Sequence, residues 1–182
     1  MNGYGCDRGM SEWRITEMEK GKKTAFYGMF LALALVAGYV EQVMPVHLGV
    51  PGVKLGLANI VVVVALYRLG IKYAFTINII RIFLAGFLFS GVFGILYSLA
   101  GGLLSFVVMI AVKQCRVFSI VGVSLAGGVA HNLGQLLTAA ALVDNIKVFV
   151  YFPVLVFSGL IFGILIGIVA GLVTDRLEKA GV

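Results

Sequence analysis

Residues 74–112 read AFTINIIRIFLAGFLFSGVFGILYSLAGGLLSFVVMIAV and hold a single charged side chain, Arg81. An α-helix needs about 20 apolar residues to cross the hydrocarbon core of a bilayer, so this stretch is long enough for two crossings. Gly91 lies near its middle, where glycine favours a tight turn. The stretch therefore predicts two helices that turn back on each other inside a membrane.

The composition of the whole chain extends this prediction. The sequence has 182 residues, of which 61% are hydrophobic and 12% are charged. A soluble domain of this size carries about a quarter charged residues and has too small a core to bury so much apolar surface. The 24 glycines and only 3 prolines are typical of closely packed transmembrane helices. We predict an all-α integral membrane bundle of about six transmembrane helices.

The charge and the cysteines exclude two other classes. The net charge of +6 would favour nucleic-acid binding in a soluble protein, but the basic residues are scattered among short loops, so no nucleic-acid partner is expected. Cys6 and Cys115 form no CxxC pair. We therefore expect no disulfide, no metal site and no cofactor.

The apolar runs divide the chain into three regions. We expect a polar tail at 1–23, a six-helix transmembrane domain at 24–173 and a charged tail at 174–182. The first tail is either a short interfacial helix around Trp13 or lacks fixed structure. The expected spans are Thr24–Met44, Val53–Leu69, Ile71–Phe89, Val92–Val112, Phe118–Val143 and Val148–Val173.

Loop charges predict the orientation of these spans. With the amino terminus inside, most Lys and Arg residues fall in cytoplasmic segments, whereas only Lys54 and Lys147 fall in outer segments. Cytoplasmic loops are enriched in Lys and Arg. We therefore expect a multi-pass protein of the cytoplasmic membrane with both termini in the cytoplasm. The orientation depends on the very short turn from Arg68 to Lys72.

Polar side chains at membrane depth are costly, so they mark candidate functional residues. Arg81 lies about ten residues into its span, roughly 15 Å from the cytoplasmic end. On the expected topology, polar residues of several spans share the outer half of the bilayer. We predict that they line a pocket for a polar or anionic small molecule, formed by Lys54, Asn59, Asn78, Arg81, His131, Asn132 and Gln135.

Two structural alternatives remain open for these patterns. In the structural alternative, Arg81 pairs with Glu41 at the end of the first span, and the amide side chains merely join helices. Small residues let helices approach closely, which explains the pentapeptide SLAGG at 98–102 and again at 124–128 without an internal duplication. A similar small-residue face on the first span is a candidate for packing a partner helix or a neighbouring span of this chain: Gly28, Ala32, Ala34 and Gly38.

Four blocks of the chain carry a family resemblance: PGVKLGLANIVVVVALYRLG (51–70), NIIRIFLAGFLF (78–89), SLAGGLLSFVVM (98–109) and GVSLAGGVAHNLGQLL (122–137). In order and spacing they resemble the Gx transporter family, which is also labelled heptaprenyl diphosphate synthase component I. The resemblance covers nearly all of residues 24–173. The blocks PGVKLGLANI and AHNLGQ are its most specific parts.

The resemblance implies two different functions. The family is similar in size and layout to the S components of energy-coupling factor transporters, which bind a solute near the outer face and join a membrane coupling subunit and two ATPases. Our leading hypothesis is such a substrate-binding subunit, with the small-residue face of the first span against the coupling subunit. The enzyme label implies instead a non-catalytic partner of a soluble prenyltransferase in isoprenoid synthesis. A third possibility is a membrane anchor in a redox or quinone-linked complex.

Missing motifs limit what the chain does alone. The sequence contains no DDxxD-like motif, with which a prenyltransferase holds magnesium and diphosphate, and no GxxxxGK[ST] phosphate loop. We therefore expect neither prenyl transfer nor ATP hydrolysis by this chain itself.

Overall fold

The structure is a computed structural model that describes residues 6–43, 56–115 and 117–179. These residues are almost entirely helical, which confirms the predicted all-α class for the described part of the chain. Within them, a π-helical turn, η1 (Gly86–Ser90), and a 3-10 segment, η2 (Ile146–Tyr151), accompany the α-helices. The α-helices are α1 (Cys6–Val43), α2 (Leu57–Arg68), α3 (Ile71–Ala85), α4 (Gly91–Gln114), α5 (Ile120–Val143) and α6 (Phe152–Lys179).

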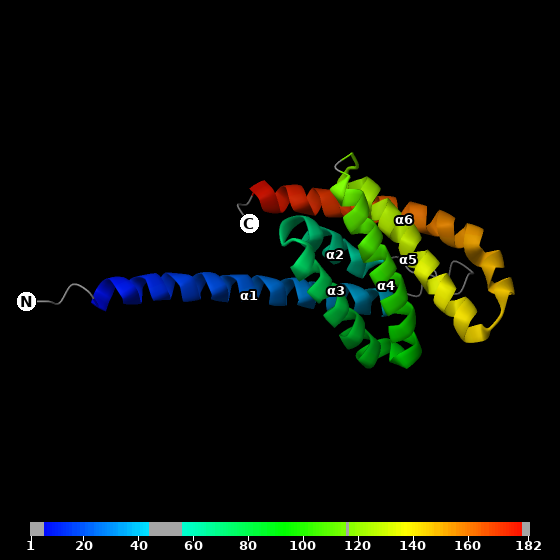
Figure 1. Cartoon of the computed structure of the whole chain (residues 1–182), viewed down its shortest axis with the longest axis horizontal. Helices are drawn as coiled ribbons and strands as arrows, with labels where there is room; N and C mark the ends of the chain where they lie inside the picture. The colour runs from blue at the N-terminus through cyan, green and yellow to red at the C-terminus, as the bar shows by residue number, and fades with distance from the viewer. Residues whose placement is uncertain (1–5, 44–55, 116, 180–182) are drawn as a thin grey trace, which may run out of the picture.

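The apolar stretch at 74–112 folds back on itself as predicted. After α3 and η1, Gly91 adopts a φ of 67°, a left-handed conformation that glycine accepts without steric cost. Figure 1 shows α3 and α4 side by side, joined at one end by this turn. The turn at the other end of α3 is equally short, because α2 ends at Arg68 and α3 begins at Ile71.

The second predicted span differs from the helix in the structure. Its described part, α2, begins at Leu57 after Gly56 and has 12 residues, which is roughly 18 Å of helix against a hydrocarbon core of about 30 Å. Residues 62–66 are at most 2% exposed. A helix that is apolar on every side is buried either by protein or by lipid. Because α2 packs against α1, α3 and α6, protein buries it. The run IVVVVAL therefore marks a core helix.

The predicted count of about six crossings is not confirmed. Four described stretches are long and apolar enough to cross a membrane, which indicates a membrane protein. They are Thr24–Val43, Ile71–Gln114, Ile120–Val143 and Ile146–Lys179, the second of which contains the α3–α4 hairpin.

Helix α1 also continues across the predicted boundary at residue 24. It has 38 residues and begins at Cys6, and Figure 1 shows its amino-terminal part extending beyond the other helices. The described part of the polar tail is therefore helical, in one piece with the first span. Where α1 meets the membrane surface stays a prediction.

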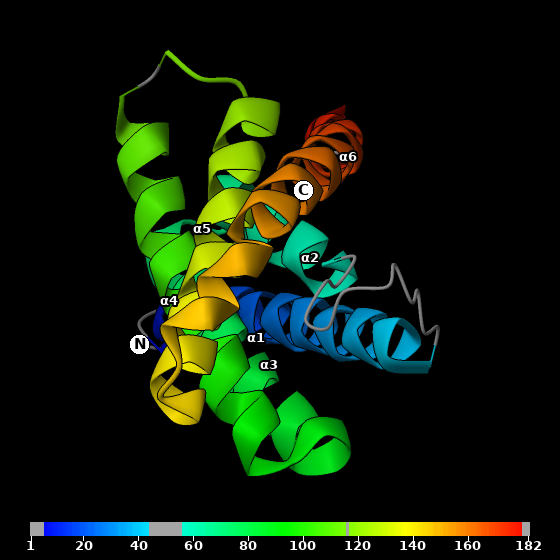
Figure 2. The same cartoon turned by 90° about the vertical axis from the view of Figure 1, so that its right-hand side faces the viewer.

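Helix α5 lies between α4 and α6 (Figures 1 and 2). Glycines bring the backbones together. A Cβ on Gly134 would lie 2.8 Å from the carbonyl oxygen of Ala100, and one on Gly163 would lie 2.7 Å from Cα of Leu125. The first SLAGG segment packs on α5 near Gly134, whereas the second packs on α6 through Gly128 and Gly159. The repeat therefore reflects two separate close helix contacts.

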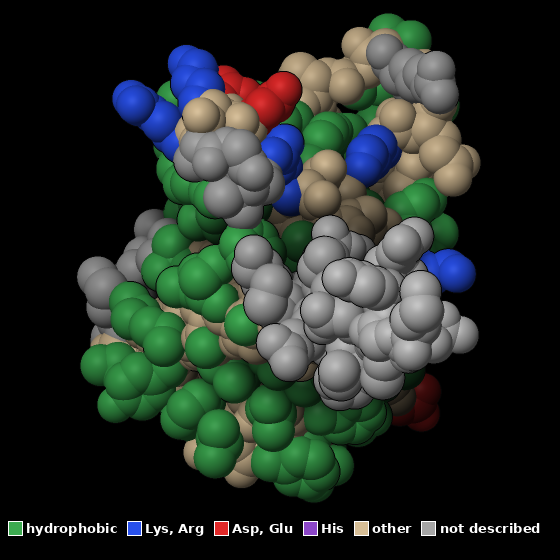
Figure 3. All heavy atoms as spheres, turned by 90° about the vertical axis from the view of Figure 1, so that its left-hand side faces the viewer, with side chains coloured by type: hydrophobic (Ala, Val, Ile, Leu, Met, Phe, Trp, Pro, Cys, Tyr) green, Lys and Arg blue, Asp and Glu red, His purple; other side chains and the backbone are tan. Residues whose placement is uncertain are grey.

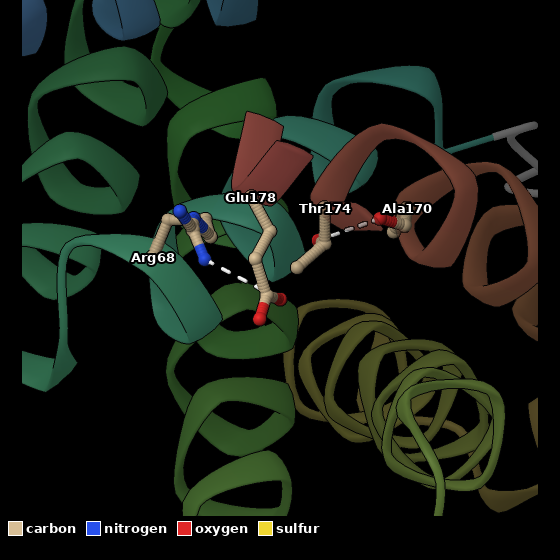
Figure 4. A network of polar contacts seen from close by, with 4 residues as sticks. All are labelled: Arg68, Ala170, Thr174 and Glu178. Carbon is tan, nitrogen blue, oxygen red and sulfur yellow. Dashed lines mark hydrogen bonds and ion pairs between the residues drawn. The ribbon is translucent and has the colours of Figure 1, made fainter. Parts of the chain in front are cut away.

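The carboxyl ends of α2, α4 and α6 lie together. Lys113 donates a 2.6 Å hydrogen bond from Nζ to the carbonyl oxygen of Leu66. Arg68 forms an ion pair with Glu178 at 3.7 Å, as Figure 4 shows. Figure 3 shows Lys and Arg side chains gathered over the upper part of one face, above a mainly hydrophobic lower part. The carboxyl ends of these three helices therefore share one side of the fold.

Aromatic contacts define the sense of the first and third helices. Tyr27 stacks on Tyr73 near the start of α3, with ring centroids 4.2 Å apart. Tyr39 meets Phe89 of η1 at 5.1 Å. Helices α1 and α3 therefore run in the same sense.

Candidate functional site

Arg81 lies in α3, the first arm of the helical hairpin, where two asparagines hold its guanidinium. Its Nε and Nη2 atoms donate to Oδ1 of Asn78, at 3.1 and 2.8 Å. Nη2 also donates to Oδ1 of Asn59 in the first turn of α2, at 2.7 Å. Asn78 and Arg81 are three residues apart and therefore share a helix face. The structure brings these three predicted site residues into direct contact.

Asn78 extends this network to α4. Its Nδ2 atom donates to the carbonyl oxygen of Gly102 at 3.3 Å, and Asn78 is 2% exposed. A Cβ on Gly102 would lie 2.7 Å from Cδ1 of Ile82 and 3.5 Å from Nδ2 of Asn78. Glycine at this position therefore lets α3 approach close enough for the hydrogen bond. Sequence reasoning did not include Gly102 in the site, although the repeated SLAGG segment pointed to it.

Glu41 joins the network through the backbone that precedes α2. Its Oε1 atom accepts a hydrogen bond from the amide of Gly56 at 2.5 Å. Gly56 has a φ of 76°, which a residue with a side chain rarely adopts. Among the described residues, the direct ion pair between Glu41 and Arg81 is not formed, although the Glu41 carboxylate acts on Arg81 electrostatically. We call this group the Arg81 cluster: Glu41, Gly56, Asn59, Asn78, Arg81 and Gly102.

Two predicted residues of α5, Asn132 and Gln135, make no hydrogen bond to the Arg81 cluster within the described part of the chain. A Cβ on Gly101 would lie 3.0 Å from Cγ of Gln135 and 3.1 Å from Cε1 of His131, so both side chains pack against α4 beside the cluster. Gln135 is 8% exposed, and its Oε1 atom has no hydrogen-bond partner in the described part of the chain.

Asn132 points to a different neighbour. Its Nδ2 atom donates to the carbonyl oxygen of Leu155 at 2.7 Å and to Oγ of Ser158 at 3.1 Å, both on α6. Consecutive residues of a helix face different directions, which separates Asn132 from His131. Lys54, the remaining predicted site residue, lies outside the described residues. That these residues bind a substrate stays a prediction.

The small-residue face of α1 is divided by the fold. Ala34 is 1% exposed in the core, and Gly38 approaches Ala58 of α2. Gly28 and Ala32 are exposed, and a Cβ on Gly28 would have open space around it. The first pair therefore packs within this chain, and the second remains a candidate for a partner helix. The described residues contain no group of three or more His, Cys, Asp or Glu side chains that could hold a metal ion.

Comparison with known proteins identifies the family but adds no individual relative. No curated protein and no solved structure matches the chain significantly. The model of one protein family, described as heptaprenyl diphosphate synthase component I, matches residues 30–173. This region contains the described helices from the core-facing part of α1 to most of α6, together with the Arg81 cluster. With a match over most of its length, the chain belongs to the heptaprenyl diphosphate synthase component I family.

Proposed function

We propose that this chain is a non-catalytic membrane component of a polyprenyl diphosphate synthase. The observation that carries the proposal is the family match over residues 30–173, which takes in the apolar helices as a unit. A polyprenyl diphosphate is an amphiphile with a long apolar chain. A membrane-embedded subunit offers such a product a place in or beside the bilayer while a soluble partner performs the chemistry.

The acidic residues of the sequence support the non-catalytic part of this proposal. Its three aspartates are Asp7, Asp144 and Asp175, too far apart in sequence for a DDxxD motif. Diphosphate chemistry of this kind needs Mg²⁺ held by carboxylates. The partner, a soluble prenyltransferase, supplies those carboxylates.

Co-purification and activity test this function. The full-length chain, affinity-tagged in its native host, is purified from membranes in mild detergent and incubated with farnesyl diphosphate, isopentenyl diphosphate and Mg²⁺. We expect a soluble prenyltransferase with a DDxxD motif to co-purify and long-chain polyprenyl diphosphate to form. Removal of this chain from the complex should lower the yield or the length of the product. A fully active prenyltransferase that never associates with this chain contradicts the proposal.

The second candidate is a substrate-binding subunit of an energy-coupling factor type transporter. It is favoured by the Arg81 cluster, because polar side chains of α2 and α3 converge around a cation within apolar helices. In this case Gly28 and Ala32 contact the coupling subunit. The same purification separates the two candidates, since recovery of ATPase subunits with a membrane coupling protein supports transport. Both candidates place the chain in the cytoplasmic membrane with its termini in the cytoplasm.

A further inference from the structure

The depth of Arg81 makes its charge costly. It lies about ten residues after Ile71, where α3 begins, and about nine before Ser90, where η1 ends, so roughly 14 Å of helix lies on either side. A guanidinium at the end of an apolar helix can extend to the membrane surface, but one in the middle cannot reach it easily. Such a residue needs partners within the protein or a bound ligand.

The neighbours of Arg81 orient its guanidinium but do not occupy all of its nitrogen donors. Nε and Nη2 are occupied by the carbonyl oxygens of Asn78 and Asn59. Nη1 forms no hydrogen bond with the described residues. Arg81 as a whole is half-buried. The planar guanidinium is therefore fixed by α2 and α3, and its Nη1 remains without a hydrogen bond among the described residues.

The positive charge of Arg81 also has no directly bonded carboxylate among the described residues. Within this part of the chain, the oxygens that bond to Arg81 belong to the neutral amides of Asn59 and Asn78, and the Glu41 carboxylate accepts a hydrogen bond from Gly56 instead. Charged hydrogen bonds to an oxyanion are stronger than those to neutral acceptors. Binding a phosphoryl oxygen at Nη1 would give the guanidinium a directly bonded anion, and the fixed geometry means that little side-chain entropy is lost on binding.

We propose that Arg81 binds an oxyanion of an amphiphilic ligand through Nη1, and that this ligand is a prenyl diphosphate whose chain lies among the apolar helices. The identity of the ligand rests on the proposed function. Asn59 and Asn78 act as positioning residues that hold the guanidinium. The charge selects the diphosphate group, and the surrounding apolar surface selects the prenyl chain.

Binding of farnesyl diphosphate to the purified full-length chain in detergent tests this site, with native mass spectrometry as the readout. Farnesol and inorganic diphosphate are measured in parallel. We expect farnesyl diphosphate to bind and farnesol to bind much more weakly. Arg81→Gln should weaken the binding of farnesyl diphosphate by about tenfold or more, since a charged hydrogen bond is lost. Arg68→Gln removes one positive charge at the Glu178 ion pair and should leave binding unchanged.

The alternatives give distinct results. Equal binding to the wild type and Arg81→Gln overturns the site, as does equal binding of farnesol and farnesyl diphosphate. If inorganic diphosphate alone binds with the same dependence on Arg81, the oxyanion site is supported and the prenyl part of the proposal is overturned. Should Arg81→Gln fail to fold, Arg81→Lys keeps the charge but replaces the planar guanidinium, which the two asparagines hold, with a compact ammonium that lacks this fixed fork. Unchanged affinity in that variant also overturns the site.

Failure of this site is distinguishable from failure of the proposed function. A chain that co-purifies with an active prenyltransferase but shows no binding that depends on Arg81 keeps the function and loses the site. A chain that binds farnesyl diphosphate through Arg81 but assembles with ATPase subunits keeps the site and loses the synthase role.

Discussion

Nη2 of Arg81 lies 2.7 Å from Oδ1 of Asn59, so one hydrogen bond joins the second half of α3 to the first turn of α2. The contact is possible because α2 and α3 are joined by a short turn and pack along each other. The same guanidinium holds Asn78, which in turn bonds to α4. Three helices are therefore connected through one cation.

Asn59→Ala should destabilise the protein. The substitution removes an acceptor from a charged donor, which costs about 1–3 kcal/mol where the donor is buried. Thermal unfolding of the detergent-purified protein, followed by circular dichroism, measures the effect. Gln114→Ala changes an exposed residue at the end of α4 and should leave the midpoint within error. Equal midpoints for both variants would show that the Arg81–Asn59 bond contributes nothing to stability.

Gly163→Ala should also lower the unfolding midpoint, through packing rather than polarity. The new methyl group would lie 2.7 Å from Cα of Leu125, a backbone atom that cannot move aside alone. Forcing α5 and α6 apart costs about 1–3 kcal/mol. Gly171→Ala is the matched control in the same helix, because a Cβ there meets nothing within 4 Å. Alanine favours helix over glycine, so this control should be neutral or slightly stabilising.

The local features of the fold were predictable from the sequence, whereas the surroundings of each helix were not. Glycine at position 91 and the short Arg68–Lys72 segment marked turns that the structure contains, because turn chemistry is local. The run before Arg68 is apolar on all sides, and periodicity alone does not distinguish burial by protein from burial by lipid. That protein buries α2 therefore became clear only from its packing.

The candidate site shows the same limit. The spacing of Asn78 and Arg81 predicted a shared helix face, and the structure places both side chains in contact. The prediction grouped Asn132 with His131 because they have similar depth. A single helix touches several neighbours, and the sequence does not say which neighbour each face meets. The partners of Asn132 on α6 therefore required the assembled fold.

Thiol labelling in intact cells should confirm the predicted orientation. With Cys6 replaced by serine, Cys115 is the remaining thiol, and it is exposed after the end of α4. A membrane-impermeant maleimide should fail to label it until the cells are permeabilised. In a variant that lacks both native cysteines, Ile146→Cys, at a position 81% exposed, should react in intact cells. Labelling of Cys115 from outside would reverse the orientation.

Asn132→Ala should separate structural polarity from ligand binding. Asn132 donates two hydrogen bonds to α6, so its loss should lower stability by about 0.6–2 kcal/mol, the range found for polar contacts between membrane helices. Its side chain makes no hydrogen bond to the Arg81 cluster, so the affinity for farnesyl diphosphate should stay within twofold of the wild type. Arg81→Gln should show the larger loss of affinity. Thermal unfolding and native mass spectrometry on the same samples measure both quantities. A loss of binding in Asn132→Ala as large as in Arg81→Gln would mean that the ligand contacts α5 as well, and that the site extends across α4 past Gly101.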